Sequence, residues 1–287
     1  MTEVDVAADE PTEETSSPRP ARATKLWSDV RIDPVEIALP GGVGYTLRAY
    51  RLRSEVTKTP AANRPEDLDE FEAAAAAVAS RRRVADEDEN EPEDVDQDEA
   101  EFTEEDFAHE EDEEDQEDQD EEAGADEEIP LFLARNGRVL LFRDKQKLVD
   151  FVRSGEENDL DQLDSWPDLV KRLESDDVVP LPEDTYELDL VVENLRGGPD
   201  AWDPPLILKA GEVARDLGYA LRIEPVLIAL AAGSPLDDLD EALRAVESGG
   251  IGSFFAKRRL RKIPAQQSSL AWRTIIGKIS TATEWRD

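Results

Sequence analysis

The sequence predicts an α+β fold: a small antiparallel sheet built from two hairpins, with C-terminal helices packed on one face of it. Three observations predict this class. Paired apolar runs flank turn residues at two places, segments of helical periodicity follow, and a long acidic insertion separates the two pairs of runs. No internal repeat is apparent, so we expect one ordered domain within the 287 residues.

The first predicted hairpin follows residues 1–25, which are rich in Glu, Thr, Ser and Pro. That composition has too little apolar surface to offset the entropy of ordering, so we expect a disordered tail. Within residues 26–67, apolar side chains alternate along 35–39 and again along 45–49, on either side of the glycine-rich stretch 41–44. This stretch lacks the Lys-Ser/Thr and the helix of a phosphate-binding loop, so we interpret it as a hairpin turn beside one buried sheet face.

The second predicted hairpin has the strongest local signal in the chain. Two apolar runs, residues 129–134 and 139–142, flank Arg135-Asn136-Gly137-Arg138. Asn and Gly tolerate the positive φ that a type I′ turn requires, and this turn matches the twist of paired strands. We therefore expect a tight hairpin at the start of the remaining part of the domain, residues 129–287.

Helices are predicted after the second hairpin. Asp144 has the side chain of an N-cap, and Gly155 suits a helix C-terminus. Helical apolar spacing and breakers predict the further segments 166–173, 186–195, 206–217, 225–232, 237–246 and 268–285.

The insertion between the two hairpins has two parts. Residues 68–84 are rich in alanine and predict a helix, with Arg81, Arg82 and Arg83 at its C-terminal end. Residues 85–128 hold 28 Asp or Glu among 44 residues and no Lys or Arg, so we expect a disordered polyanionic tract. The net charge of −38 belongs largely to this tract, because the rest of the chain has 43 acids against 33 bases.

One segment of the acidic tract combines carboxylates with aromatic side chains. Residues 101–107, EFTEEDF, carry Phe102 and Phe107, two of the few large apolar residues of the tract. Acidic segments with aromatics can fold onto an apolar groove with a basic rim. We therefore predict Phe102 and Phe107 as partner-binding residues.

The most basic segment of the chain precedes the last predicted helix, and Phe254, Phe255 and Trp272 lie near it. Its basic residues are Lys257, Arg258, Arg259, Arg261 and Lys262. Three interpretations stay open: a solvated rim, a nucleic-acid site that neutralises phosphates, or a surface on which the acidic tract folds back. In the third case the tract could instead fold back on Arg81–Arg83, and a basic or nucleic-acid partner would displace it.

Several classes of site are excluded or disfavoured. The chain has no cysteine and only one histidine, His109, inside the acidic tract, which excludes thiolate chemistry and a His-based zinc site and nearly excludes a Ser-His-Asp triad. No stretch fits a calcium loop. The acids at Asp184, Glu187, Asp189 and Glu193 have the spacing of a solvated helix face. We predict no catalytic residue, no cofactor and no metal.

The chain also lacks membrane signals. The acidic amino terminus differs from a signal peptide, and no apolar run is long enough to span a bilayer, so we expect a cytoplasmic protein with no membrane partner.

Short motifs in this order resemble a family of uncharacterised actinobacterial proteins often labelled primosomal protein. The matching residues are Tyr45-Thr46-Leu47, Phe142, Ser154-Gly155, Asn158-Asp159-Leu160 and Trp166. The resemblance covers residues 27–53 and 129–285, and this chain departs from the shorter members by its insertion. The label implies an association with replication restart, but no helicase, primase or zinc motif is present.

Together these observations predict a non-enzymatic interaction protein. Its polyanionic loop would engage a basic protein or nucleoprotein, or would mask the basic cluster of its own chain. Two alternatives remain: a replication accessory protein that binds nucleic acid through residues 257–262, and an enzyme whose site only the fold assembles. The sequence does not predict an oligomeric state.

Overall fold

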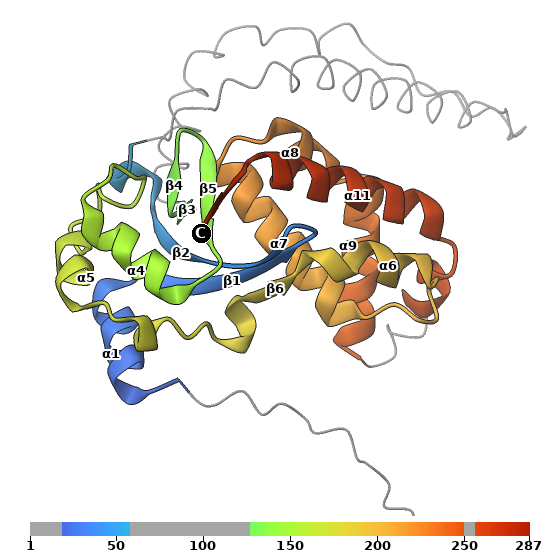
Figure 1. Cartoon of the computed structure of the whole chain (residues 1–287). Coiled ribbons are helices and arrows are strands. Elements are labelled where there is room, and N and C mark those ends of the chain that lie inside the picture. Colours follow the sequence, from blue (N-terminus) through green and yellow to red (C-terminus); the bar gives the residue numbers. More distant parts are fainter. Residues whose placement is uncertain (1–18, 58–126, 250–255) are drawn as a thin grey trace, which may run out of the picture.

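The computed structural model describes residues 19–57, 127–249 and 256–287. In these ranges helices surround a seven-stranded sheet, and the predicted α+β class is confirmed (Figure 1). Three predicted features lie outside the described residues: the helix over 68–84, the partner-binding residues Phe102 and Phe107, and almost all of the acidic tract.

The elements follow the chain in this order. The strands are β1 (Asp33–Leu39), β2 (Gly42–Leu52), β3 (Glu128–Phe132), β4 (Ala134–Arg135), β5 (Arg138–Phe142), β6 (Thr185–Glu187) and β7 (Thr283–Arg286). The α-helices are α1 (Ala21–Val30), α4 (Lys145–Ser154), α5 (Trp166–Arg172), α6 (Leu188–Arg196), α7 (Pro204–Ala220), α8 (Glu224–Ala229), α9 (Pro235–Glu247) and α11 (Ala265–Thr281). Short 3-10 helices are η1 (Arg53–Glu55), η2 (Ser175–Asp177) and η3 (Pro182–Asp184), and residues 256–260 form a further helical turn.

Both predicted turns are present, but the strands pair differently at the second one. β1 and β2 form the first hairpin, and Asn136 and Gly137 have the positive φ values of 53° and 69° expected in the second. The run 129–134 is divided into β3 and β4 at Leu133. β3 pairs antiparallel with β2, so only the two residues of β4 pair with β5.

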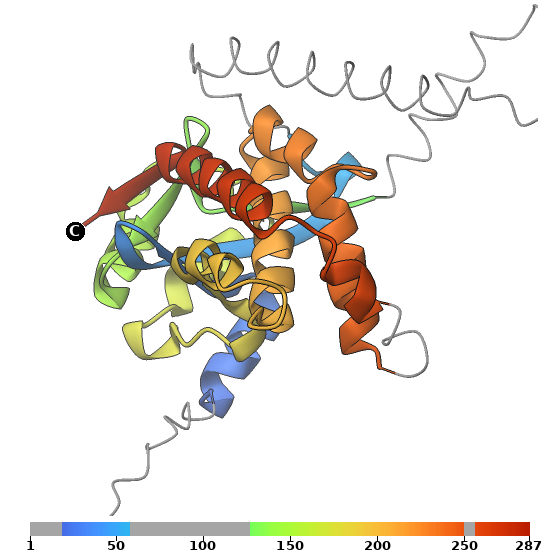
Figure 2. The same ribbon diagram turned by 90° about the vertical axis from the view of Figure 1, so that its right-hand side faces the viewer.

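Two segments predicted as parts of helices are strands instead. Tyr186 lies in β6, which pairs parallel with β1, and α6 starts only at Leu188. Figure 2 shows α11 leading directly into β7. β7 pairs parallel with β5, and Trp285 lies opposite Leu141 in this pairing. Both parallel pairs join residues more than 100 positions apart in sequence, so local periodicity could not predict them.

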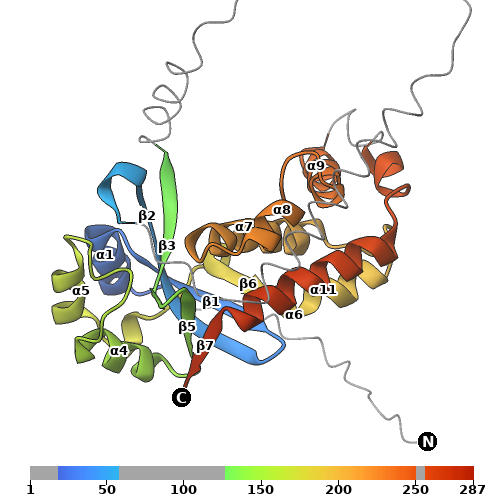
Figure 3. The ribbon, with the colours of Figure 1, turned by 90° about the horizontal axis from the view of Figure 1, so that it is seen from above.

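The sheet has a hydrophobic core on each face, which corrects the prediction of one covered face. Val139 and Leu141 of β5 point to the side of α6, α7, α9 and α11, whereas Leu140 and Phe142 point to the side of α1, α4 and α5. Figure 3 shows the two groups of helices on opposite sides of the strands. Alternation along these strands therefore separates two cores rather than a core and solvent.

Helix ends agree with the predictions at some positions and differ at others. Asp144 caps α4, accepting hydrogen bonds from the backbone N–H groups of Gln146 and Lys147, and Gly155 ends the helix at φ 75°. By contrast, α1 begins at Ala21, inside the segment predicted as a disordered tail, and α7 continues to Ala220, beyond the predicted end at residue 217.

Candidate functional site

An apolar groove of about 490 Å³ opens between α8, α9 and α11. Its volume lies within the usual range for ligand pockets in proteins. The groove is lined by Pro225, Ile228, Ala229, Ser234, Pro235, Leu236, Asp238, Arg259, Lys262, Ile263, Pro264, Gln267, Ser268 and Ala271. Ile228, Ala229, Ile263 and Ala271 are half-buried, so apolar floor atoms remain in contact with water. An apolar segment could bury this surface.

Local hydrogen bonds fix the helix starts on two walls of the groove. The hydroxyl of Ser234 accepts from the N–H of Asp237 at 3.1 Å and donates to the carbonyl of Ala229 at 2.9 Å, which joins the start of α9 to the end of α8. On the other wall Pro264 precedes α11, and Ser268 donates to its carbonyl at 3.3 Å. The walls are therefore set by local hydrogen bonds as well as by the core beneath them.

The predicted basic cluster is divided between two sides of the helical turn 256–260. Arg259 and Lys262 line the groove, whereas Lys257 and Arg261 line a separate depression of about 310 Å³ beside Trp202. Arg258 is exposed and lines neither. The five predicted residues therefore do not all line one depression.

Acidic side chains of the same domain neutralise part of the cluster. Arg259 donates to Asp238 at 2.5 Å and to Glu241 at 3.2 Å, and Arg261 lies 3.1 Å from Asp200. Within the described ranges Lys262 has no ion pair, so it is the free cation of the groove rim. This pairing lowers the positive potential that phosphate binding would need.

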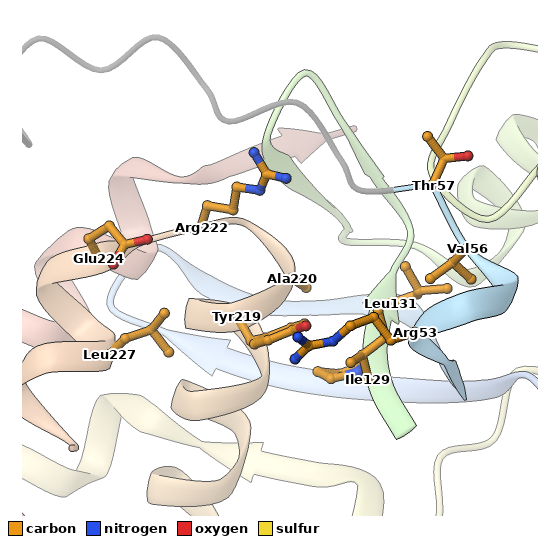
Figure 4. A pocket seen from close by; sticks show the side chains of 11 residues that line it. Arg53, Val56, Thr57, Ile129, Leu131, Tyr219, Ala220, Arg222, Glu224 and Leu227 are labelled. Atoms are coloured by element: carbon orange, nitrogen blue, oxygen red, sulfur yellow. The ribbon is translucent and has the colours of Figure 1, made fainter. Parts of the chain in front are cut away.

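A second pocket, of about 460 Å³, lies where the described chain leaves for the insertion and returns from it (Figure 4). Arg53 is the main contact there. It donates to the Glu127 carboxylate at 2.6 Å, its backbone N–H donates to the Glu127 carbonyl at 2.9 Å, and its guanidinium lies 5.8 Å from the centre of the Tyr219 ring. These contacts hold both ends of the insertion beside the C-terminal end of α7.

We call this second pocket, lined by Arg53 and Tyr219 among others, the root pocket. The short helix α8 separates it from the apolar groove. Glu224 and Leu227 line the root pocket, while Pro225, Ile228 and Ala229 line the groove. The groove therefore lies across α8 from the pocket at which the acidic insertion is attached.

A buried polar network joins the sheet to α7. The guanidinium of Arg48 on β2 donates to Asp184 at 2.9 Å and to Asp216 of α7 at 3.0 Å. The hydroxyl of Tyr50 donates to Asp216 at 2.6 Å, and Arg48 lies over the ring of Tyr186 at 5.5 Å. Arg48 is 6% exposed, so this network is internal to the fold.

Burial and charge act in opposite directions on this network. Burial by itself would lower the pKa of Arg48, but the surrounding Tyr186 and Tyr50 and the carboxylates of Asp216 and Asp184 raise it. Burial raises the pKa of Tyr50, and its hydrogen bond to Asp216 adds to that increase. Arg48 thus stays charged and the hydroxyl of Tyr50 stays protonated at neutral pH, so the hydrogen bonds between the sheet and α7 persist.

Sequence reasoning missed this network. The sequence predicts one buried face for the strand that carries Arg48 and predicts neither Arg48 nor Tyr50 as a site residue. It predicts Asp184 on a solvated helix face. Asp184 is in fact 7% exposed and lies before the helix, whereas Glu187, Asp189 and Glu193 are exposed. An arginine and a tyrosine on the supposed outer face of a strand were the available signal.

The described part of the chain offers little else for metal or membrane binding. No group of three His, Cys, Asp or Glu side chains there could hold a metal ion, and His109 lies outside it. No described helix has both the length and the apolar character needed to cross a bilayer.

A family model described as the SatS C-terminal domain matches residues 122–276, more than half of the chain. The chain belongs to the SatS C-terminal domain family. The crystal structure of the SatS C-terminal domain in complex with bromine matches with a TM-score of 0.55 at 19% identity, over 91% of this chain and 96% of that chain. This likeness shows the same fold. No curated protein matches the chain.

The SatS C-terminal domain match includes the groove and both carboxylates that bind Arg48, whereas β1, β2 and β7 lie outside it. The primosomal label of the family suggested by the sequence motifs is not confirmed, because neither match carries it.

Proposed function

We propose that this chain is a non-enzymatic interaction protein whose apolar groove binds a polypeptide segment that combines apolar and acidic side chains. The observation that carries this proposal is the half-buried apolar floor between α8, α9 and α11, with a cationic rim on one side. Apolar burial would supply most of the affinity, because exposed ion pairs contribute little.

The charge of the rim favours an acidic occupant. Arg259 already has two carboxylate partners, but Lys262 has none among the described residues. A carboxylate that follows the apolar side chains of a bound segment would meet Lys262. We propose a separate role for the acidic tract of residues 85–128. Its negative charge attracts basic surfaces of a partner protein and so speeds their encounter.

A nucleic-acid function gains no support from the arrangement. The predicted cluster is divided between two depressions, and two of its five cations are paired with acids of the domain.

The proposal can be tested with a fluorescein-labelled synthetic peptide that carries two Phe residues five positions apart among Glu residues. We expect the full chain to raise the anisotropy of this peptide, and Ala271→Trp to weaken binding at least tenfold by filling the groove. The matched control is Leu270→Trp, which adds an indole on the same helix at a side chain that is 64% exposed and outside the groove.

A second pair of variants tests the rim. Lys262→Glu should weaken binding several-fold, and Arg258→Glu, which makes the same charge change outside the groove lining, should have a smaller effect. Equal peptide affinity of the wild type and Ala271→Trp, or no binding by either at millimolar peptide, would overturn the proposal.

A further inference from the structure

The groove and the acidic insertion of the same chain are complementary. The groove offers apolar floor atoms, and at its rim lies Lys262, which has no ion pair with any described residue. Residues 101–107 offer two phenylalanines and four carboxylates, and they belong to a tract that is otherwise almost without large apolar side chains. Among all segments of the chain outside the described ranges, this one best combines aromatic side chains with negative charge.

The attachment of the insertion keeps this segment close to the groove. The chain returns from the insertion at Glu127, beside Arg53 of the root pocket, and α8 lines both that pocket and the groove. Phe107 precedes Glu127 by 20 residues. A flexible chain of that length has a root-mean-square extension of about 25 Å and a maximal reach of about 65 Å, which is more than twice the length of the 17-residue helix α11 that borders the groove.

We infer that residues 101–107 occupy the groove of their own chain, with Phe102 and Phe107 on its apolar floor and the intervening carboxylates toward Lys262. This inference rests on the proposed function and deepens it, because it makes the groove autoinhibited. A partner segment must then displace the internal one.

The tether sets the size of the effect. Short flexible tethers give effective concentrations of about 1 mM. If the isolated segment binds with a dissociation constant of about 0.1 mM, occupancy in cis weakens the binding of an external peptide by about tenfold. A moderate internal interaction therefore suffices to control access to the groove.

The first test measures the external peptide described above with the full chain. Phe102→Ser/Phe107→Ser should raise its affinity about tenfold. Val95→Ser, which removes the remaining large apolar residue of the tract, should leave the affinity unchanged. Unchanged affinity in the double variant would overturn the inference.

The second test detects the internal contact directly and uses the absence of cysteine in the chain. Ala108→Cys is combined either with Gln267→Cys in the groove lining or with Asp168→Cys on α5, on the opposite face of the sheet. In a glutathione redox buffer the groove pair should form its intramolecular disulfide with an effective concentration at least tenfold above that of the control pair.

Adding Phe102→Ser/Phe107→Ser should reduce the groove pair to the level of the control pair. Equal disulfide formation in both pairs, or no response to loss of the phenylalanines, would overturn the inference. If Ala271→Trp still blocks the external peptide in that case, the proposed function stands and only the internal occupancy fails. If Ala271→Trp changes neither peptide binding nor disulfide formation, both fail.

Discussion

Replacing Arg48 by methionine should destabilise the protein by about 3–5 kcal/mol. Methionine keeps much of the side-chain length but removes the positive charge that lies 2.9 Å from Asp184 and 3.0 Å from Asp216. The side chains of these carboxylates are only 9% and 15% exposed, so water would compensate little of the lost interaction. The expected loss therefore comes mainly from carboxylate charge left unpaired in the interior.

The matched control for this change is Arg172→Met. Arg172 lies 2.8 Å from Asp29, at nearly the same distance, but the two side chains are 41% and 43% exposed. An exposed pair of this kind contributes about 0.2–1 kcal/mol. The two variants thus compare similar contact distances in buried and exposed surroundings.

Urea unfolding followed by tryptophan fluorescence would measure both free energies of unfolding. Adding Asp184→Asn to the Arg48→Met variant should recover part of the lost stability, because one unpaired buried charge is then removed. A loss below about 1 kcal/mol for Arg48→Met, or equal losses for Arg48→Met and Arg172→Met, would refute the argument that burial sets the strength of this network.

Two further predictions concern the sheet and its pH dependence. Gly44→Ala should cost about 1–3 kcal/mol in thermal or urea unfolding, because its Cβ would lie 2.8 Å from the Trp285 ring and 2.9 Å from Leu141 Cβ, whereas Gly277→Ala meets no atom within 4 Å and should not destabilise. If both alanine variants behave alike, the close packing of β7 against the first hairpin is not what requires glycine. Burial raises the pKa of Asp184 in the folded protein, although the neighbouring Arg48 acts in the opposite direction. The folded state therefore holds the Asp184 proton more tightly than the unfolded state, whose pKa is about 3.9. The resulting stabilisation is complete below the unfolded pKa and is lost as the pH rises through the folded pKa. The stability of Asp184→Asn relative to the wild type should therefore increase between pH 3 and pH 6, and a constant or decreasing difference in urea unfolding would contradict this.

Local chemistry explains which parts of the fold were predictable. The turn at Asn136-Gly137 and the cap at Asp144 depend on backbone conformation and on hydrogen bonds within a few residues, so the sequence by itself determines them. Apolar spacing likewise predicted most helices, although it missed α1 and placed both ends of α7 inside the observed helix. The polyanionic character of residues 85–128 also follows from composition alone.

Contacts between distant segments decided the rest. β6 and β7 are strands because β1 and β5 present free edges to them, and their own sequences continue the periodicity of adjacent helices. Arg48 is buried because α7 covers the face of β2 that a two-hairpin sheet would leave in water. The groove depends on how α8, α9 and α11 meet, so the sequence could indicate an acidic aromatic segment and its basic counterpart, but only tertiary packing could assemble the apolar surface between them.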